Sequence, residues 1–194
     1  MAHYSGYIYV PHGTYQQWRD ATLGNGYNVD YAFGEQCFDY PALCYYQYGL
    51  RLITKAGGGG AKDCWTVSRW VNSKPPFTSH TGKTNIRRGD ILVFGVGEWG
   101  HIGFADENYN PSHPNNIWLL GQNQVGNGSG YPVTRAFWSL NGFLGIFRNA
   151  NWQSSPAPTP TPTPVVYNKG KYNFVLYNRR KRQDKWTRKP LKQN

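Results

Sequence analysis

The chain is poor in cysteine and in acidic residues, and it contains no long apolar run. Its 194 residues include three cysteines, an odd number without a CxxC pair, which argues against a disulfide framework and against a structural zinc site. No apolar stretch approaches the roughly 20 residues of a membrane-spanning helix. The opening MAHYSGYIYV lacks the basic start and the apolar segment of a secretory signal. We therefore expect at least one free thiol, and either a soluble intracellular product or a mature form whose signal has been removed.

Basic residues outnumber acidic ones, but the excess is confined to one end of the chain. The sequence has 21 Lys and Arg against 10 Asp and Glu, a formal charge of +11. Residues 1–150 hold eleven of the basic and nine of the acidic residues, a net of +2, so the other +9 belongs to residues 151–194. The first part is therefore nearly neutral, and the basicity is a property of the tail.

The order of the apolar patterns predicts an α+β fold. Aromatic residues make up 16% of the chain and glycine contributes 23 residues, a composition that favours strands and turns in a folded protein. Helical spacing predicts helices within residues 14–23, 37–50 and 61–71, the first with a capping box that opens at Thr14. From residue 87 onward, five short apolar runs separated by Gly, Asn and Pro predict strands. Helices followed by strands indicate helices packed on an antiparallel sheet.

A proline- and threonine-rich segment divides the chain. SSPAPTPTPTP, residues 154–164, cannot form a packed core and predicts an extended linker. We expect a folded domain over residues 1–150, a linker over residues 151–165 and a basic tail over residues 166–194. The tail, about thirty residues long, is too short for an independent domain, so a truncated module is one interpretation of it.

Cys37 and His101 form a candidate pair for nucleophilic catalysis. Cys37 stands at the predicted start of a helix, where the helix dipole lowers the pKa of a thiol. Of the five histidines, His101 is best placed to assist, because it opens the apolar strand in GHIGFAD. Asn123, after the next predicted strand, is suited to orient the imidazole with its amide oxygen. The alternative is that Cys37 is an inert buried thiol, the interpretation that we give to Cys44 and Cys64.

Five short motifs follow one another in a characteristic order over about residues 14–148. The motifs are GEQCFD, AKDCW, RRGDILVF, GHIGFAD and LLGQN. In this order they resemble the CHAP family, the cysteine- and histidine-dependent amidohydrolases and peptidases that cut bacterial peptidoglycan. The resemblance implies a papain-like fold, with N-terminal helices packed on an antiparallel sheet.

The resemblance also implies a reaction and a role for each matched residue. Cys37 would be the nucleophile, His101 the general base and later the acid, and Asn123 the group that orients His101. The reaction would be acyl transfer through a thioester that water hydrolyses. The backbone N–H of Cys37 and the side chain of Gln36 are the candidate oxyanion donors. Some phage members carry an acid two residues before the Asn, where this chain has Gly121, so we expect a triad without a fourth residue.

The segment that leads to the nucleophile resembles the calcium loop of some phage members of the family. NVDYAFGEQCFD matches a DxDGxxGxQCxD-like loop, with Asn and Tyr at two of its positions. The resemblance implies Ca²⁺ ligands from Asn28, Asp30, the Ala32 carbonyl and Asp39, and no organic cofactor. With two carboxylates in this set, we expect weaker binding than in a more acidic loop. The alternative is that Asn28 and Asp30 are ordinary turn residues.

Together, the residues and the resemblance predict a peptidoglycan hydrolase of the phage endolysin type. The cut bond would be an amide, either between muramic acid and L-alanine or within the stem or cross-bridge peptides. Without a signal peptide, such an enzyme gathers in the host cytoplasm before it acts at the wall. We expect a monomer whose basic tail binds teichoic acid or other anionic wall polymers, with no specific nucleic acid partner. The rival interpretation is a non-catalytic protein that binds the wall or nucleic acid through that tail.

Overall fold

The structure, a computed structural model, divides the chain into two units, Met1–Ser155 and Pro156–Asn194. It describes all residues except 56–58, 125–129, 154–165, 170–171, 176–188 and 191–194. The proline- and threonine-rich segment predicted as a linker therefore lies outside the described residues. In the second unit, three strands pair antiparallel in the order β11-β10-β9. They are β9 (Val166–Lys169), β10 (Tyr172–Val175) and β11 (Lys189–Pro190).

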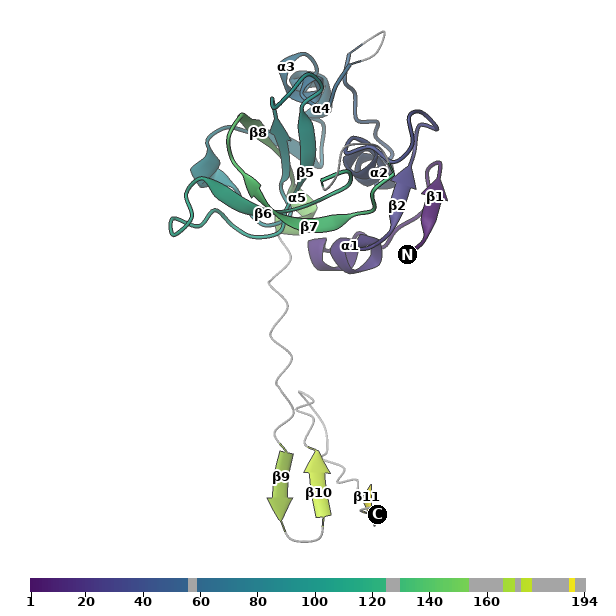
Figure 1. Ribbon diagram of the computed structural model, residues 1–194, viewed down its shortest axis with the longest axis vertical. Coiled ribbons are helices and arrows are strands. Elements are labelled where there is room, and N and C mark those ends of the chain that lie inside the picture. Colours follow the sequence, from purple (N-terminus) through teal and green to yellow (C-terminus); the bar gives the residue numbers. More distant parts are fainter. Residues whose placement is uncertain (56–58, 125–129, 154–165, 170–171, 176–188, 191–194) are drawn as a thin grey trace. The chain divides into compact units, whose positions relative to one another are not determined.

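A six-stranded antiparallel sheet forms the centre of the first unit, in the order β3-β8-β4-β5-β6-β7 (Figure 1). The strands are β3 (Phe77–His80), β4 (Ile91–Phe94), β5 (His101–Ala105), β6 (Asn116–Gly121), β7 (Thr134–Ser139) and β8 (Phe143–Asn149). The five predicted apolar runs are β4 to β8, and the α+β class is confirmed. The sequence patterns do not predict β3, nor the parallel pair of β1 (His3–Ser5) and β2 (Gly26–Asn28).

The first two predicted helices are present. Helix α1 (Tyr15–Thr22) opens with the predicted capping box, in which the Gln17 N–H donates to the Thr14 hydroxyl and the Thr14 N–H donates to the Gln17 side chain. Helix α2 (Asp39–Gln47) starts two residues after Cys37. Among the described residues, no helix has the length and apolar character needed to cross a bilayer.

The third predicted helix is wrong as a single element. Residues 61–71 instead contain two short helices, α3 (Asp63–Thr66) and α4 (Arg69–Asn72). The Asp63 carbonyl accepts the N–H groups of both Val67 and Ser68, which ends the first helix. The Cys64 carbonyl, which would accept the Ser68 N–H in a continuing helix, instead accepts Asn72 Nδ2 at 3.0 Å.

The first unit continues beyond the predicted boundary at residue 150. Helix α5 (Ala150–Gln153) follows β8 directly. Trp152 is buried, packs against Tyr15 and Trp18, and donates its Nε1–H to the His12 carbonyl at 2.7 Å. The predicted start of the linker at residue 151 is therefore too early, because a core tryptophan follows it.

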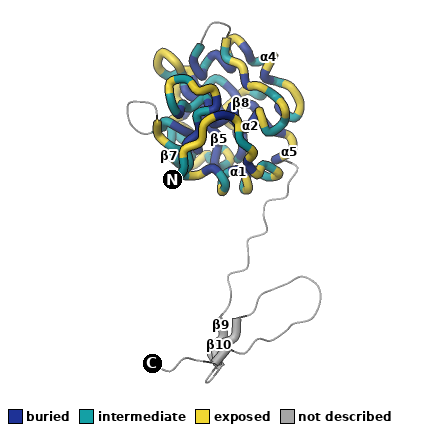
Figure 2. The backbone as a smooth tube through the Cα atoms, turned by 90° about the vertical axis from the view of Figure 1, so that its right-hand side faces the viewer, coloured by how far each residue is buried: buried dark blue, intermediate teal, exposed yellow. Residues whose placement is uncertain are grey.

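An aromatic core lies between the helices and the sheet. Trp18 of α1 stacks on Tyr40 of α2 with ring centroids 5.4 Å apart, and both rings contact Phe104 of β5. Cys44 and Cys64 are fully buried beside these rings, as predicted. Figure 2 shows the buried stretches of α2, β5 and β8 in the interior of this unit. This packing fixes the start of α2 against β5. The predicted nucleophile lies in the turn that leads into α2, and the predicted base opens β5.

Candidate active site

Cys37 lies in the turn that leads into α2, directly before the N-cap residue Phe38. The backbone N–H of Ile102 in β5 interacts with the Cys37 sulfur and acts to lower the pKa of the thiol, although the net shift is upward. Because Ile102 follows His101, this contact brings the thiol to the start of the strand that carries the imidazole. The structure thus brings the two predicted segments together. A direct hydrogen bond between the thiol and the ring is not among those of the described residues.

The thiol of Cys37 is not activated in this state. Burial raises its pKa to about 11, the charge of Asp39 adds to the rise, and the N–H groups of Ile102 and Phe38 oppose it. The pKa lowering expected from the helix terminus is therefore outweighed by desolvation. Cys37 nevertheless keeps some exposed surface, whereas Cys44 and Cys64 have none and burial raises the pKa of both.

His101 is buried at the start of β5, with 6% of its surface exposed. Its ring stacks on Trp138 of β7, with centroids 4.3 Å apart and planes at 22°. Burial lowers its pKa to about 4, and the side chain of Gln124 acts in the opposite direction. The ring is therefore neutral at pH 7, the form that can accept a proton.

Asn123 lies two residues beyond the end of β6. Its φ is 54°, in the left-handed region, and its N–H donates to the Tyr131 carbonyl at 3.3 Å. Its Oδ1 is buried and has no hydrogen-bond partner among the described residues. The described contacts join Asn123 to neither the thiol nor the imidazole.

Gln122 ties the nucleophile segment to the sheet, a role that the sequence does not predict. Its Oε1 accepts the Tyr27 N–H at 2.7 Å, and its Nε2 donates to the carbonyls of Tyr27 and Gln36, both at 2.9 Å. The Gln36 carbonyl and the Cys37 N–H belong to one planar peptide group. A donor on that carbonyl therefore fixes the direction of the Cys37 N–H and polarises it. The only signal in the sequence is the position of Gln122 beside Asn123.

Gln36 is held by its backbone. Its N–H donates to Asp39 Oδ2 at 2.7 Å, and its carbonyl also accepts the Asp39 N–H at 3.2 Å. Within the part of the chain that the structure describes, its side-chain amide makes no hydrogen bond. That amide, predicted as an oxyanion donor, is thus uncommitted.

Asp39 organises the loop between β2 and α2. Its buried carboxylate accepts the Val29 N–H at 2.9 Å as well as the Gln36 N–H. Burial nevertheless raises its pKa to about 7, and the charge of Asp30 adds to the rise. Asn28 Oδ1, in the same loop, is buried without a hydrogen-bond partner in the described part of the chain. Two mutually repelling carboxylates and an uncommitted amide oxygen fit a hard cation such as Ca²⁺.

The same loop also has the marks of an ordinary turn. Asp30 Oδ1 accepts the Ala32 N–H at 2.8 Å, a bond that Asp makes in turns without a metal. The described residues contain no cluster of three or more His, Cys, Asp or Glu side chains that could hold a metal. A cation here would therefore depend on amide and carbonyl oxygens together with the two carboxylates.

Exposed aromatic side chains flank both halves of the site. Tyr31 and Phe33, in the loop before Cys37, are 74% and 81% exposed, and Trp99, two residues before His101, is 63% exposed. The Trp99 backbone packs against Gly60, where a Cβ atom would lie 2.1 Å from the Trp99 carbonyl oxygen. Large apolar groups that remain in solvent beside a reactive pair are suited to contact another macromolecule.

Comparisons with known proteins match the segments that form this site. The family model described as CHAP domain matches residues 12–123, a range that includes Cys37 and His101 and ends at Asn123. A "D-alanyl-L-alanine endopeptidase" of Streptococcus phage B30 is 30% identical over 128 residues, which are 63% of this chain and 27% of the relative. A solved structure, the wild type endolysin LysIME-EF1, has a TM-score of 0.54 and 22% identity over 70% of this chain and 62% of that chain. The chain thus spans less than two thirds of either protein.

Proposed function

The chain belongs to the CHAP domain family, and from this premise we propose that it is a peptidoglycan hydrolase of the endolysin type, with Cys37 as the nucleophile. The observation that carries the proposal is that Cys37, in the turn before α2, packs against the core cluster that includes Ile102, the residue after His101. The name of the phage relative supports an endopeptidase rather than an amidase. The proposed substrate bond is therefore an amide between two amino acids of the stem or cross-bridge peptide, and the link to muramic acid is the second choice.

The pKa values of the pair favour a neutral resting state. With the Cys37 pKa raised to about 11 and the His101 pKa lowered to about 4, a thiolate and an imidazolium do not form before the substrate binds. His101 then takes the thiol proton as sulfur attacks the carbonyl carbon, and the imidazolium gives that proton to the leaving amine as the C–N bond breaks. Water attacks the resulting thioester with His101 again as base, and the acid product and the thiol are released.

The oxyanion of the tetrahedral intermediate is proposed to meet the backbone N–H of Cys37. Gln122 supports this role, because its donation to the Gln36 carbonyl orients and polarises the peptide group that carries this N–H. The uncommitted side-chain amide of Gln36 is the proposed second donor. Asn123 is the proposed third residue of the site, and its Oδ1, unpartnered among the described residues, leaves it available for a catalytic contact.

A Ca²⁺ ion is proposed to bind Asn28, Asp30, the Ala32 carbonyl and Asp39. When bound, the ion would neutralise the two carboxylates and stiffen the loop that leads into α2; it takes no part in bond cleavage. Binding raises the free energy of unfolding by about 2.7 kcal/mol at a Ca²⁺ concentration of 100 Kd. We therefore expect EDTA to lower the Tm of the full chain and Ca²⁺ to restore it, and an Asp30→Asn variant to lose this response.

The basic tail is proposed to hold the enzyme at the wall. Residues 151–194 carry a net charge of +9, which attracts teichoic acid and other anionic wall polymers. We further propose that the enzyme acts as a monomer on the wall after it gathers in the host cytoplasm. Binding to teichoic acid should fall as salt is raised, because salt screens charge pairs.

Turbidity loss of purified Gram-positive cell walls tests the central proposal. The full chain is compared with Cys37→Ala and, as a matched control, with Cys44→Ala, which removes a thiol from the core instead. We expect the wild type and Cys44→Ala to clear the walls and Cys37→Ala to leave them intact. Mass spectrometry of the released fragments then separates cleavage between amino acids from release of whole stem peptides.

Two results would contradict the proposal. Equal clearing by Cys37→Ala, with its folding verified by circular dichroism, would show that this thiol is not the nucleophile. Intact walls from several Gram-positive species after treatment with folded wild type would reject the hydrolase itself.

A further inference from the structure

Gln124 is the third of the successive amide residues after β6, and its side chain folds back against the end of that strand. Its Nε2 donates to the carbonyls of Thr134 at 2.6 Å, Gly121 at 3.1 Å and Leu119 at 3.4 Å. Only a nitrogen can donate to carbonyl oxygens, so these bonds fix which end of the amide is Nε2 and which is Oε1. The direction of the Oε1 atom is therefore determined by the backbone of β6 and β7.

Gly121 allows this arrangement. A Cβ atom at position 121 would lie 3.2 Å from Cδ and 3.4 Å from Nε2 of Gln124, tighter than ordinary van der Waals contact for the nearer atom. A larger residue would displace the amide from the carbonyls that hold it. Because Gly121 has no side chain, the Gln124 amide can pack against it while Nε2 keeps its hydrogen bonds.

Two buried polar atoms, one on this amide and one on His101, have no hydrogen-bond partner among the described residues, and they are complementary. One is Oε1 of Gln124, an acceptor, and the other is Nε2 of His101, which donates when it carries the proton. Because β5 and β6 pair antiparallel, the start of β5, where His101 lies, is beside the end of β6, which Gln124 follows. The Gln124 side chain is close enough to His101 to raise its pKa against the effect of burial. A buried acceptor and a buried donor left unsatisfied each cost stability, so pairing them is favoured.

Building on the proposed function, we infer that Gln124 is a positioning residue for catalysis: its Oε1 accepts the Nε2–H of His101 and leaves Nδ1 free to take the proton of Cys37. The acceptor fixes both the tautomer and the plane of the ring, which also stacks on Trp138. A ring held from both its edge and its face needs no reorganisation when sulfur attacks.

Asn123 is not suited to the same position in this state. Its Oδ1, like Oε1 of Gln124, is buried without a partner among the described residues. Its backbone is held at φ 54° by the turn, however, and of the two amides only that of Gln124 acts on the His101 pKa. With Gln124 on Nε2, the Asn123 amide is left for contacts other than the resting imidazole.

The tautomer of His101 tests the inference without any substrate. Imidazole ¹⁵N shifts are measured at pH 7 on the full chain labelled at histidine, and the His101 signals are assigned by their loss in His101→Gln. We expect a neutral ring with its proton on Nε2 in the wild type. Gln124→Met keeps the shape and removes the acceptor, so it should give a mixture of tautomers. Asn123→Gly removes the neighbouring amide at a backbone conformation that glycine accepts, and it should leave the tautomer unchanged.

Several outcomes would overturn the inference. They are a wild-type proton on Nδ1, an unchanged tautomer in Gln124→Met, or a change in Asn123→Gly as large as in Gln124→Met. If Gln124→Met does not fold, the test uses the wild type and Asn123→Gly. A proton on Nε2 of His101 in both proteins supports the inference, and loss of that proton from Nε2 in Asn123→Gly overturns it.

Wall-clearing rates give the second measurement. For Gln124→Met we expect kcat to fall by about 10²-fold with little change in KM, the scale of a misplaced catalytic group. Because the tautomer is measured without substrate, failure of the wild type to clear walls would reject the proposed function and leave the test of Gln124 intact. An unchanged kcat in a variant with mixed tautomers would show that positioning by Gln124 is not needed.

Discussion

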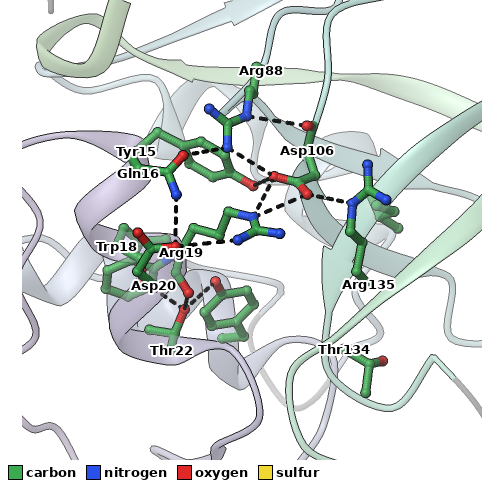
Figure 3. A network of polar contacts seen from close by, with 12 residues as sticks. Tyr15, Gln16, Trp18, Arg19, Asp20, Thr22, Arg88, Asp106, Thr134 and Arg135 are labelled. Carbon is green, nitrogen blue, oxygen red and sulfur yellow. Dashed lines mark hydrogen bonds and ion pairs between the residues drawn. The ribbon is translucent and has the colours of Figure 1, made fainter. Parts of the chain in front are cut away.

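Two buried polar regions of the first unit are built in opposite ways. In the first, Asp106 has a side chain 3% exposed and lies among three arginines and a tyrosine (Figure 3). It accepts from Arg19 at 2.9 Å, from Arg135 at 2.6 Å, from the Tyr15 hydroxyl at 3.2 Å and, more weakly, from Arg88 at 3.5 Å. The network joins α1 to β5 and β7, and the buried charge is fully compensated.

The second region, at the start of β5 and the end of β6, has few charges and many unused polar atoms. Among the described residues, eight buried side-chain nitrogen or oxygen atoms have no hydrogen-bond partner, and six of them lie at these strand ends or in the loop before Cys37. The six belong to Asn28, Glu35, His101, Asn123, Gln124 and Thr134. A satisfied network stabilises a fold, whereas unsatisfied buried groups are retained where they bind or react. The difference therefore separates a structural centre from a functional one.

The largest expected effect is on activity, from a change at His101. His101→Gln removes the base, and we expect wall clearing to slow by about 10⁴-fold, the upper range for loss of a general base. The free energy of unfolding should change far less than in a broken buried ion pair, because the ring is neutral and its main packing is the stacking on Trp138. Turbidity assays and urea unfolding measure the two quantities. A large loss of stability with modest loss of activity would place His101 with the structural network instead.

The converse change is Asp106→Ala. It leaves three arginines around an empty site, and we expect the free energy of unfolding to fall by about 3–5 kcal/mol, as for other broken buried pairs. Turnover per folded molecule should stay the same. The matched control is Asp20→Ala, which also removes a carboxylate from Arg19 but at an exposed position, and should cost less than about 1 kcal/mol. Equal decreases in the free energy of unfolding of the two variants would show that burial does not determine how much these ion pairs stabilise the fold.

Gln122 shares a feature with each region. Its amide is fully hydrogen-bonded, as in the Asp106 network, and it holds the peptide group of the nucleophile in the functional region. For Gln122→Met we expect a rate about 10²-fold lower, since the Cys37 N–H loses its fixed direction. Gln47→Met is the matched control. Gln47 also joins backbone groups through its amide, to Val10 and Ile8, but on α2 away from the site. It should lose stability and keep its rate, and an equal fall in rate would reject a special role for Gln122.

Local patterns in the sequence predict much of this molecule. Spacing and residue type predict the features that depend on neighbours along the chain. These are the capping box at Thr14, the strands β4 to β8, and the segments of Cys37 and His101. The break between α3 and α4 does not follow from such patterns, since the Cys64 carbonyl bonds to the Asn72 side chain, which also binds Ile53, nineteen residues earlier than Asn72. The sequence also does not predict that Trp152 belongs to the first unit, because its ring packs on residues that are distant in the chain.

The finer features of the site depend on three-dimensional surroundings. The sequence predicts an activated thiol from the helix terminus, but the pKa of Cys37 is set mainly by burial, which residue order does not reveal. Gln122 and Gln124 lie on either side of Asn123 and look alike in the sequence. Gln122 binds the nucleophile peptide and β2, whereas Gln124 binds β7 and acts on the imidazole of β5. Both relations depend on strands that are distant in the chain.

The last expected effect, absent at neutral pH, is the pH dependence of stability that His101 contributes. The His101 pKa of about 4 lies below its value of about 6.5 in an unfolded chain. Between these values the unfolded chain binds a proton that the folded chain does not, so the free energy of unfolding is lost as pH falls from about 6.5 toward 4, by at most about 1.4 kcal/mol per pH unit. His101→Gln should lack this contribution, which the difference between its urea unfolding curves and those of the wild type measures. Parallel curves for the two proteins would mean that the ring titrates normally and is open to water, and the contrast with the Asp106 network would then rest on the amides alone.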